Sequence, residues 1–244
     1  MGLYQLALIA LIVTGASYIQ SVTGFGFGIF AMIFLPSLLA YTEANVLSSM
    51  LSMLTSLLVV LATYRNVNWK NLIFPLASCT VTTYLAVSFI KSQKSDTLLL
   101  LLGITLFVLS VYFFFFSGKI KIKPTWYAGL IAGTVSGLMS GMFSMGGPPV
   151  VIYYVQSEKS SDRYLATISA YFVLSGAISI ATKAFAGFVT GNVWLSLAAS
   201  IVGMAVGSLV GKLTREHVKP PAIKKAVYGV MSVSGIVNIL QVLL

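Results

Sequence analysis

Charged side chains are scarce in this sequence. Its 244 residues include 15 Lys and Arg but only 5 Asp and Glu, and 8% of the residues are charged against 58% that are hydrophobic. A soluble domain of this length carries about a quarter charged residues. The scarcity therefore excludes an ordinary soluble domain and indicates a polytopic membrane protein. At about 20 residues per crossing, the chain allows roughly ten spans and no separate soluble domain.

Cysteine and histidine are nearly absent. The single Cys79 excludes an intrachain disulfide and a thiolate metal site, and its apolar neighbours predict a buried, inert thiol. The lone His217 lies in a basic loop, so Ser–His catalysis and histidine-cluster metal chemistry have no partners within the membrane. We therefore expect no catalytic residues, no metal site and no cofactor.

Long apolar runs dominate what is present. Six of them are long enough to cross a membrane alone, at residues 44–63, 72–90, 97–116, 164–185, 193–211 and 223–243. None has an Asp, Glu, Lys or Arg at its predicted centre, so no buried proton relay is visible. Glu43 is close to a broken segment, and its place at the start of a helix favours a capping role.

Two further apolar regions are interrupted by glycine and proline. Residues 3–22 predict a helix that TGFGFG (23–28) breaks before residues 29–40 resume, and residues 125–140 predict one that GMFSMGGPP (141–149) breaks before 150–156 resume. The resumed pieces are too short to span the bilayer, since twelve helical residues reach only about 18 Å of roughly 30 Å.

The cations indicate how to count these regions. If each region crosses once, the loops divide nine basic residues against six. If each region enters and returns as a re-entrant hairpin, the division is twelve against three, as the positive-inside rule expects. The twelve are Arg65, Lys70, Lys119, Lys121, Lys123, Lys159, Arg163, Lys212, Arg215, Lys219, Lys224 and Lys225, and the three are Lys91, Lys94 and Lys183. Two short full crossings per region would give the same parity, so that alternative stays open.

The hairpin count reveals an internal duplication. Each half contains a broken hairpin followed by three spans, which predicts a first repeat at residues 1–117, a basic cytoplasmic linker at 118–124 and a second repeat at 125–244. An odd number of passes in each half makes the repeats inverted, as in many secondary transporters. The predicted fold is thus an all-α polytopic membrane protein with eight to ten membrane helices. Small residues at four-residue spacing favour close helix packing (Ser78, Thr82 and Ala86 in one half, Gly203, Gly207 and Gly211 in the other).

The glycine-rich tips are the candidate site. Backbone that leaves a helix inside the membrane is tolerated only within protein or beside a watery cavity. We expect the two tips to meet near the midplane and to present helix N-termini, whose N–H groups suit an anion. Nearby hydroxyls could solvate an oxyanion, or could bond back to their own helices. The candidate substrate-binding residues are Gln20, Ser21, Gly24, Phe25, Gly26, Phe27, Gly28, Asn45, Ser49, Ser140, Ser144, Met145, Gly146, Gly147, Pro148 and Ser169.

These two motifs, GFGFG followed by Pro36 and SGLMSGMFSMGGPP (136–149), resemble those of the TauE/SafE (sulfite exporter) family of membrane transporters. The resemblance covers nearly the whole chain. It implies transport, often outward, of small sulfur-containing or organic anions such as sulfite and sulfonates.

The sequence thus predicts a secondary anion exporter that works by alternating access between its halves. A channel-like conduit and a non-transporting scaffold are the alternatives. The predicted partners are a small anion and the lipid bilayer, with no nucleic acid; the choice of proton or sodium as coupling ion, and the oligomeric state, stay open. We expect a plasma-membrane location, with both termini outside and the basic loops cytoplasmic.

Overall fold

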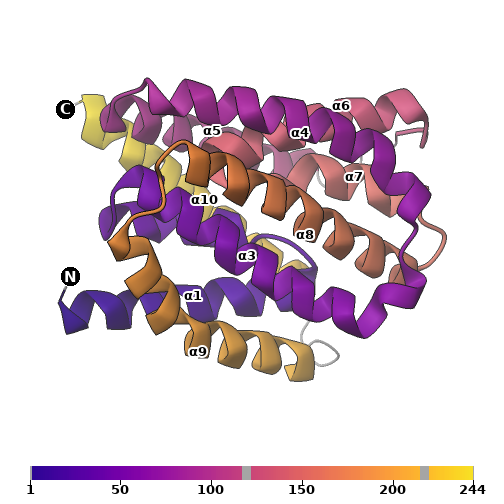
Figure 1. Cartoon of the computed structure of the whole chain (residues 1–244), viewed down its shortest axis with the longest axis horizontal. Helices are drawn as coiled ribbons and strands as arrows, with labels where there is room; N and C mark the ends of the chain where they lie inside the picture. The colour runs from indigo at the N-terminus through magenta and orange to yellow at the C-terminus, as the bar shows by residue number, and fades with distance from the viewer. Residues whose placement is uncertain (1, 117–121, 215–219, 244) are drawn as a thin grey trace.

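The computed structural model describes residues 2–116, 122–214 and 220–243, with the backbone alone for 220–226, 241 and 243. These residues form helices and no strand (Figure 1). The helices are α1 (Leu3–Thr23), α2 (Phe27–Phe34), α3 (Tyr41–Thr63), α4 (Trp69–Lys91), α5 (Ser95–Phe116), α6 (Trp126–Phe143), α7 (Gly147–Ser157), α8 (Ser161–Phe185), α9 (Gly191–Thr214) and α10 (Pro220–Leu243). Short 3-10 segments follow α2 (Leu35–Ser37) and α3 (Tyr64–Asn66).

Six of these helices, α1, α3, α4, α5, α8 and α9, are long and apolar enough to span a membrane. Five of them coincide with predicted spans, and α1 is the first arm of the first predicted hairpin. The sixth predicted span, residues 223–243, falls within α10. The chain is therefore a multi-pass membrane protein, as its composition predicts.

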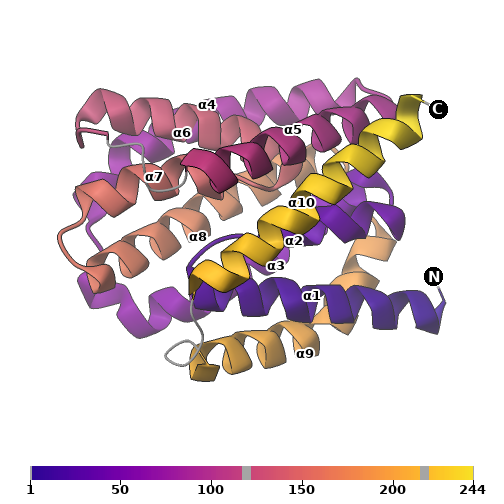
Figure 2. The same cartoon turned by 180° about the vertical axis from the view of Figure 1, so that it is seen from behind.

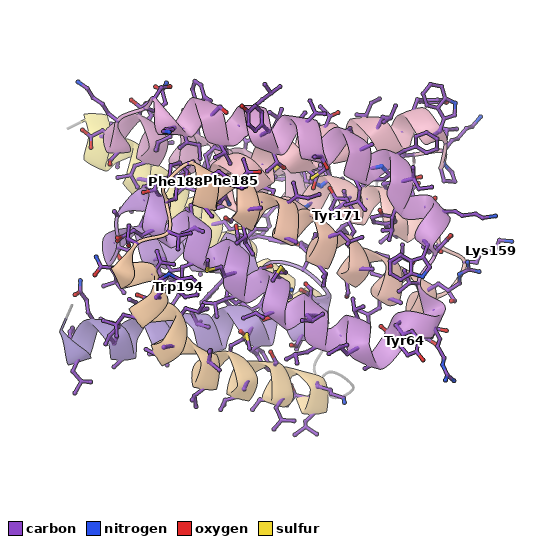
Figure 3. All side chains as sticks on the ribbon, in the orientation of Figure 1. Tyr64, Lys159, Tyr171, Phe185, Phe188 and Trp194 are labelled. Carbon is purple, nitrogen blue, oxygen red and sulfur yellow. The ribbon has the colours of Figure 1, made fainter. Side chains whose placement is uncertain are left out.

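The outer surface of the bundle suits a lipid environment. Apolar side chains such as Val81 and Val202 face outward with 60% and 71% of their surface exposed. Tyr64 and Trp194 lie toward opposite ends of the molecule (Figure 3), and both are exposed. Aromatic side chains at both ends of a membrane bundle are typical of residues that lie at the lipid–water interfaces.

Both broken regions return to the end of the bundle from which they start. The Gln5 amide, near the N-terminus, donates to the carbonyl oxygen of Leu38 at 3.1 Å. In the second region the Gln156 side chain accepts from the backbone N–H of Ile122. Both chain termini lie at one end of the molecule and Lys159 at the other (Figures 1 and 3). The in-and-back path of both hairpins is therefore confirmed.

The two halves interlock through corresponding helices. The first helix of each half packs against the fourth of the other: α1 against α9, and α6 against α4. The helices α3 and α8 pack together, as do α5 and α10, and Figure 2 shows α5 beside α10. The boundaries of the repeats, at 1–117 and 125–244, stay a prediction. The proposed linker at 118–124 lies mostly outside the described residues.

The small-residue stripes allow this close packing, as predicted. A Cβ added to Gly203 would lie 2.6 Å from the Ala10 carbonyl oxygen, so the α9 backbone lies almost directly on α1. On the other side, a Cβ on Gly137 of α6 would lie 2.5 Å from the Cys79 carbonyl oxygen of α4. No side chain fits at either contact, so glycine is required for both.

Two acidic side chains link the halves at opposite ends. Glu43, in the first turn of α3, accepts from Thr190 Oγ1 at 2.6 Å and from Asn192 Nδ2 at 3.2 Å. Glu158, at the end of α7, accepts from Asn71 Nδ2 at 2.7 Å and from Asn68 Nδ2 at 3.1 Å. We call these two groups the acidic clasps. Glu43 lies in the first turn of α3, as its expected capping role requires. Its carboxylate also joins α3 to the α8–α9 connection, which the sequence does not predict.

Candidate functional site

Left-handed backbone ends the first helix of each hairpin. Gly24 and Gly26 have φ values of 82° and 102°, which glycine adopts without steric cost. At the second break the left-handed residue is Ser144, with φ of 56°. A residue with a side chain is uncommon in this region unless local hydrogen bonds hold it there. The second break therefore depends on side-chain contacts of Ser144 and not on glycine alone.

Those contacts come from α3. The Ser144 hydroxyl lies 2.7 Å from the Asn45 carbonyl oxygen and 2.9 Å from Asn45 Oδ1. It also lies 2.7 Å from the Ser49 hydroxyl. The Tyr41 hydroxyl and the Asn45 amide both donate to the carbonyl oxygen of Met142, which the end of α6 leaves free. The first half of the chain thus holds the second tip in shape.

The two tips touch, as the sequence predicts. A Cβ added to Gly28 would collide with the carbonyl oxygen of Ser144, so the first tip reaches the second tip through bare backbone. A Cβ on Gly147 would lie 3.4 Å from Phe25. The short helices begin at Phe27 and Gly147, two and three residues before the expected starts at 29 and 150.

A cavity of about 40 Å³ lies where the tips meet. Polar side chains from several helices and the backbone of both tips line it. Twelve of the candidate residues take part: Gln20, Phe25, Gly26, Phe27, Gly28, Ser49, Ser140, Ser144, Met145, Gly146, Gly147 and Pro148. We call this space the tip cavity. Ser52, Ser136 and Ser175 add three more hydroxyl groups to its wall.

The other four candidates lie elsewhere. Ser21, Gly24 and Ser169 line a second cavity of about 460 Å³ between α1, α3, α8 and α9, which we call the vestibule. Asn45 lines neither space and acts through its contacts with Ser144 and Met142. The vestibule extends toward Thr63 and Lys212, at the end of the molecule that carries Lys159.

Gln20 is the side chain that both spaces share. Its amide nitrogen donates to Ser56 Oγ at 2.7 Å and to the Ser52 carbonyl oxygen at 3.1 Å. Its amide oxygen accepts from Ser52 Oγ at 3.1 Å. These bonds join α1 to α3 and place Gln20 as a partition between the vestibule and the tip cavity.

A tyrosine holds the second tip from the α8 side. The Tyr171 hydroxyl, inside the bundle in Figure 3, donates to Ser136 Oγ at 2.9 Å. Ser136 Oγ in turn donates to the Gly146 carbonyl oxygen at 2.6 Å. Both tyrosine and serine are buried, so this chain of donors fixes the Gly146 backbone.

Lys183 is the functional side chain that the sequence analysis misplaced. Its position two residues before the end of the predicted span 164–185 made it a loop charge beside Lys91 and Lys94. The side chain is instead fully buried. Its Nζ donates to Ser49 Oγ at 2.6 Å, to Ser144 Oγ at 3.0 Å and to the Ser140 carbonyl oxygen at 3.2 Å. The amine of Lys183 therefore lies directly behind the wall of the tip cavity.

A pattern in the sequence does point to this lysine. On α8 the residues Thr167, Tyr171, Ser175, Ser179 and Lys183 follow one another at four-residue spacing. All five are buried. Positions four apart share one helix face, so these residues form one buried polar stripe that ends at Lys183. This four-residue spacing is the sequence signal that groups Lys183 with the buried face of α8.

The described residues hold no group of three or more His, Cys, Asp or Glu that could bind a metal ion. Lys183, the serines and the tip backbone supply hydrogen-bond donors, and donors suit an anion better than a metal cation.

Comparison with known proteins agrees with this chemistry. The family model described as sulfite exporter TauE/SafE matches residues 8–237. The chain belongs to the TauE/SafE family. A probable sulfite/organosulfonate exporter TauE from Cupriavidus necator is 22% identical over 236 residues, covering 93% of this chain and 90% of that protein. No solved structure matches the chain significantly.

Membership of TauE/SafE confirms the resemblance carried by the two glycine-rich motifs. The family model is described as that of a sulfite exporter, so the chain is a membrane transport protein of this family.

Proposed function

We propose that this protein exports small sulfur oxyanions, of the size of sulfite, by alternating access around the tip cavity. The observation that carries the proposal is the meeting of two broken helices at a cavity lined by hydroxyl groups and backbone. Broken helices that meet inside the membrane form the substrate sites of many secondary transporters.

The chemistry of the cavity supports an anionic substrate. The helix α2 begins there without a side-chain cap, so N–H groups of its first turn and the positive end of its dipole face the tip. The helix α7 contributes fewer donors, because Pro148 and Pro149 lack N–H groups. The hydroxyls of Ser140 and Ser175, on α6 and α8, line the cavity without a hydrogen bond to another described residue, so they add donors without adding charge.

The size of the cavity supports a small substrate. A buried water needs roughly 10–15 Å³ of such space, so about 40 Å³ holds roughly three waters or one compact oxyanion. Phe25 and Phe27 occupy part of the wall. We therefore favour sulfite and one-carbon sulfonates such as methanesulfonate over larger organosulfonates, which the cavity would admit only after widening.

The arrangement of the two spaces supports alternating access over a continuous conduit. The vestibule leads from the Lys159 end of the molecule to Gln20. On the other side of the tip cavity, Tyr41, Asn45 and Lys183 are buried and bonded to the second tip. These contacts support our assignment of the structure to a state with access from one side. With the basic loops cytoplasmic and the termini outside, that access is from the cytoplasm of a plasma-membrane protein, which suits export.

Sulfite counterflow in proteoliposomes tests the proposal. We expect saturable exchange of sulfite by the purified protein. Gly28→Ala should reduce exchange at least about tenfold, because even a methyl group collides with the Ser144 carbonyl and separates the tips. The matched control is Gly229→Ala in α10, where an added Cβ meets nothing within 4 Å.

Elution from a sizing column in detergent, measured for all three proteins, reports whether each is folded. A folded Gly28→Ala protein with normal exchange would disprove the role of the tips. Flux that rises linearly with sulfite and shows no counterflow would identify a conduit, and no flux in the wild type would identify a scaffold.

A further inference from the structure

Lys183 places a basic amine where the described residues provide no acidic partner. Its three hydrogen-bond partners, two serine hydroxyls and one carbonyl, are all neutral. The ion pair found among the described residues joins Arg163 to Glu158 at the opposite end of the molecule. A buried ammonium ion is costly unless an anion pairs with it, so an anion in the tip cavity would stabilise the protonated form of Lys183.

Glu43 is the carboxylate on α3, the helix that supplies Ser49, and it bonds elsewhere, accepting from Thr190 and Asn192. Ser49 and Ser144, which accept from Lys183, bond in turn to Asn45, whose side chain is also neutral. No carboxylate among the described residues therefore lies within ion-pair distance of Lys183.

The groups that hold Lys183 are the wall of the tip cavity. Ser49, Ser140 and Ser144 each contact Nζ and each line the cavity. The ammonium is thus separated from the cavity by one layer of side chains. In a low-dielectric surrounding, a charge at this depth raises the affinity of the cavity for anions without touching them.

We propose that Lys183 is the specificity-determining residue that makes the tip cavity selective for anions, with the transported anion as its counter-ion. This inference rests on the proposed function, because it assigns the charge preference of the same cavity. Lys183 is a positioning residue: it polarises the serine wall and sets the local potential, while the tips and hydroxyl groups make contact with the substrate.

The test compares two probes of equal shape and different charge, methanesulfonate and neutral methanesulfonamide, in binding to the purified full chain. We expect the wild type to bind methanesulfonate at least about tenfold more tightly. Lys183→Gln keeps a donor near Ser49 but removes the charge, and Lys183→Met removes both. Both should bring the affinity ratio close to one, and Lys183→Arg should keep most of it. Lys91→Met is the matched control, since Lys91 is exposed at the same end and should leave the ratio unchanged.

Melting temperature in detergent separates charge selection from structural support. If Lys183→Gln lowers the melting temperature and leaves the affinity ratio unchanged, the lysine only supports the fold and the proposal is overturned. A wild type that binds both probes equally also overturns it. The proposed function fails separately, when the folded Gly28→Ala protein exchanges sulfite normally. If Lys183→Met does not fold, the ratio of the methanesulfonate and methanesulfonamide affinities measured for Lys183→Gln tests the proposal alone.

Discussion

At the scale of single residues, the site depends on backbone positions more than on reactive side chains. Gly28 lies against the Ser144 carbonyl, and Ser144 adopts a left-handed conformation that its bonds to Asn45 maintain. One tip is therefore shaped by a residue that has no side chain and the other by a residue whose side chain is fully bonded. Substitutions at these two positions should differ in kind.

Ser144 offers the sharper contrast. Ser144→Val should destabilise the protein by about 1–3 kcal/mol, because a β-branched residue is strained at positive φ and cannot donate to Asn45. Ser144→Gly relieves the strain and should retain a folded protein, although it loses the same hydrogen bonds. Thermal unfolding in detergent measures both. A Ser144→Val protein as stable as Ser144→Gly would show that the left-handed backbone costs nothing here.

The sequence predicts where the helices break but not which side chains gather around the breaks. Glycine and proline clusters locate both breaks, because breaking a helix is a local property of the chain. The burial of Lys183 is not local: its stem carries the ammonium from the end of α8 to Ser49 and Ser144, which belong to other helices. The same reasoning explains Ser169 and Ser21, which face the vestibule and not the tip cavity.

At the scale of elements, the helix pairs across the two halves set the rigidity of the bundle. The α4–α6 contact is built from glycines on α6 that lie against the α4 backbone. The sequence predicts the close packing from residue spacing, but not which helix is the partner. Spacing describes one face of one helix, and the partner follows only from the fold.

The glycine contact between α4 and α6 should not tolerate a larger residue. Gly137→Leu should lower the melting temperature and the folded yield, with a cost of about 1–3 kcal/mol or more, since a Cβ alone approaches the Cys79 carbonyl to 2.5 Å. Val135→Ala, on the exposed side of the same helix, is the control and should change little. Equal melting temperatures for the two variants would mean that α4 and α6 can separate freely.

At the scale of the whole molecule, the vestibule predicts access from one side of the membrane. Cys79 is buried, so it leaves a low background for labelling. We expect Ala205→Cys, in the vestibule wall, to react with a membrane-impermeant maleimide added from the side of Lys159. Gly191→Cys, at the start of α9, should react only from the other side.

In oriented vesicles, labelling of Ala205→Cys from the side of the termini instead would contradict the assigned direction of the vestibule. Protection of Ala205→Cys by sulfite would connect the vestibule to the tip cavity. Labelling of Gly191→Cys and Lys159→Cys from the same side would contradict the hairpin topology itself.

The acidic clasps have a consequence for the second conformation. Glu43 accepts a hydrogen bond from Asn192 at one end, and Glu158 accepts one from Asn68 at the other. Each half is therefore bonded to the other by an equivalent glutamate–asparagine contact. If the two halves exchange conformations, the second state can be built by placing the sequence of each half on the backbone of the other. In that second state the opening lies between α3, α4, α6 and α8, at the end of the molecule where the termini are. If the protein works by alternating access, one structure then describes both of its end states.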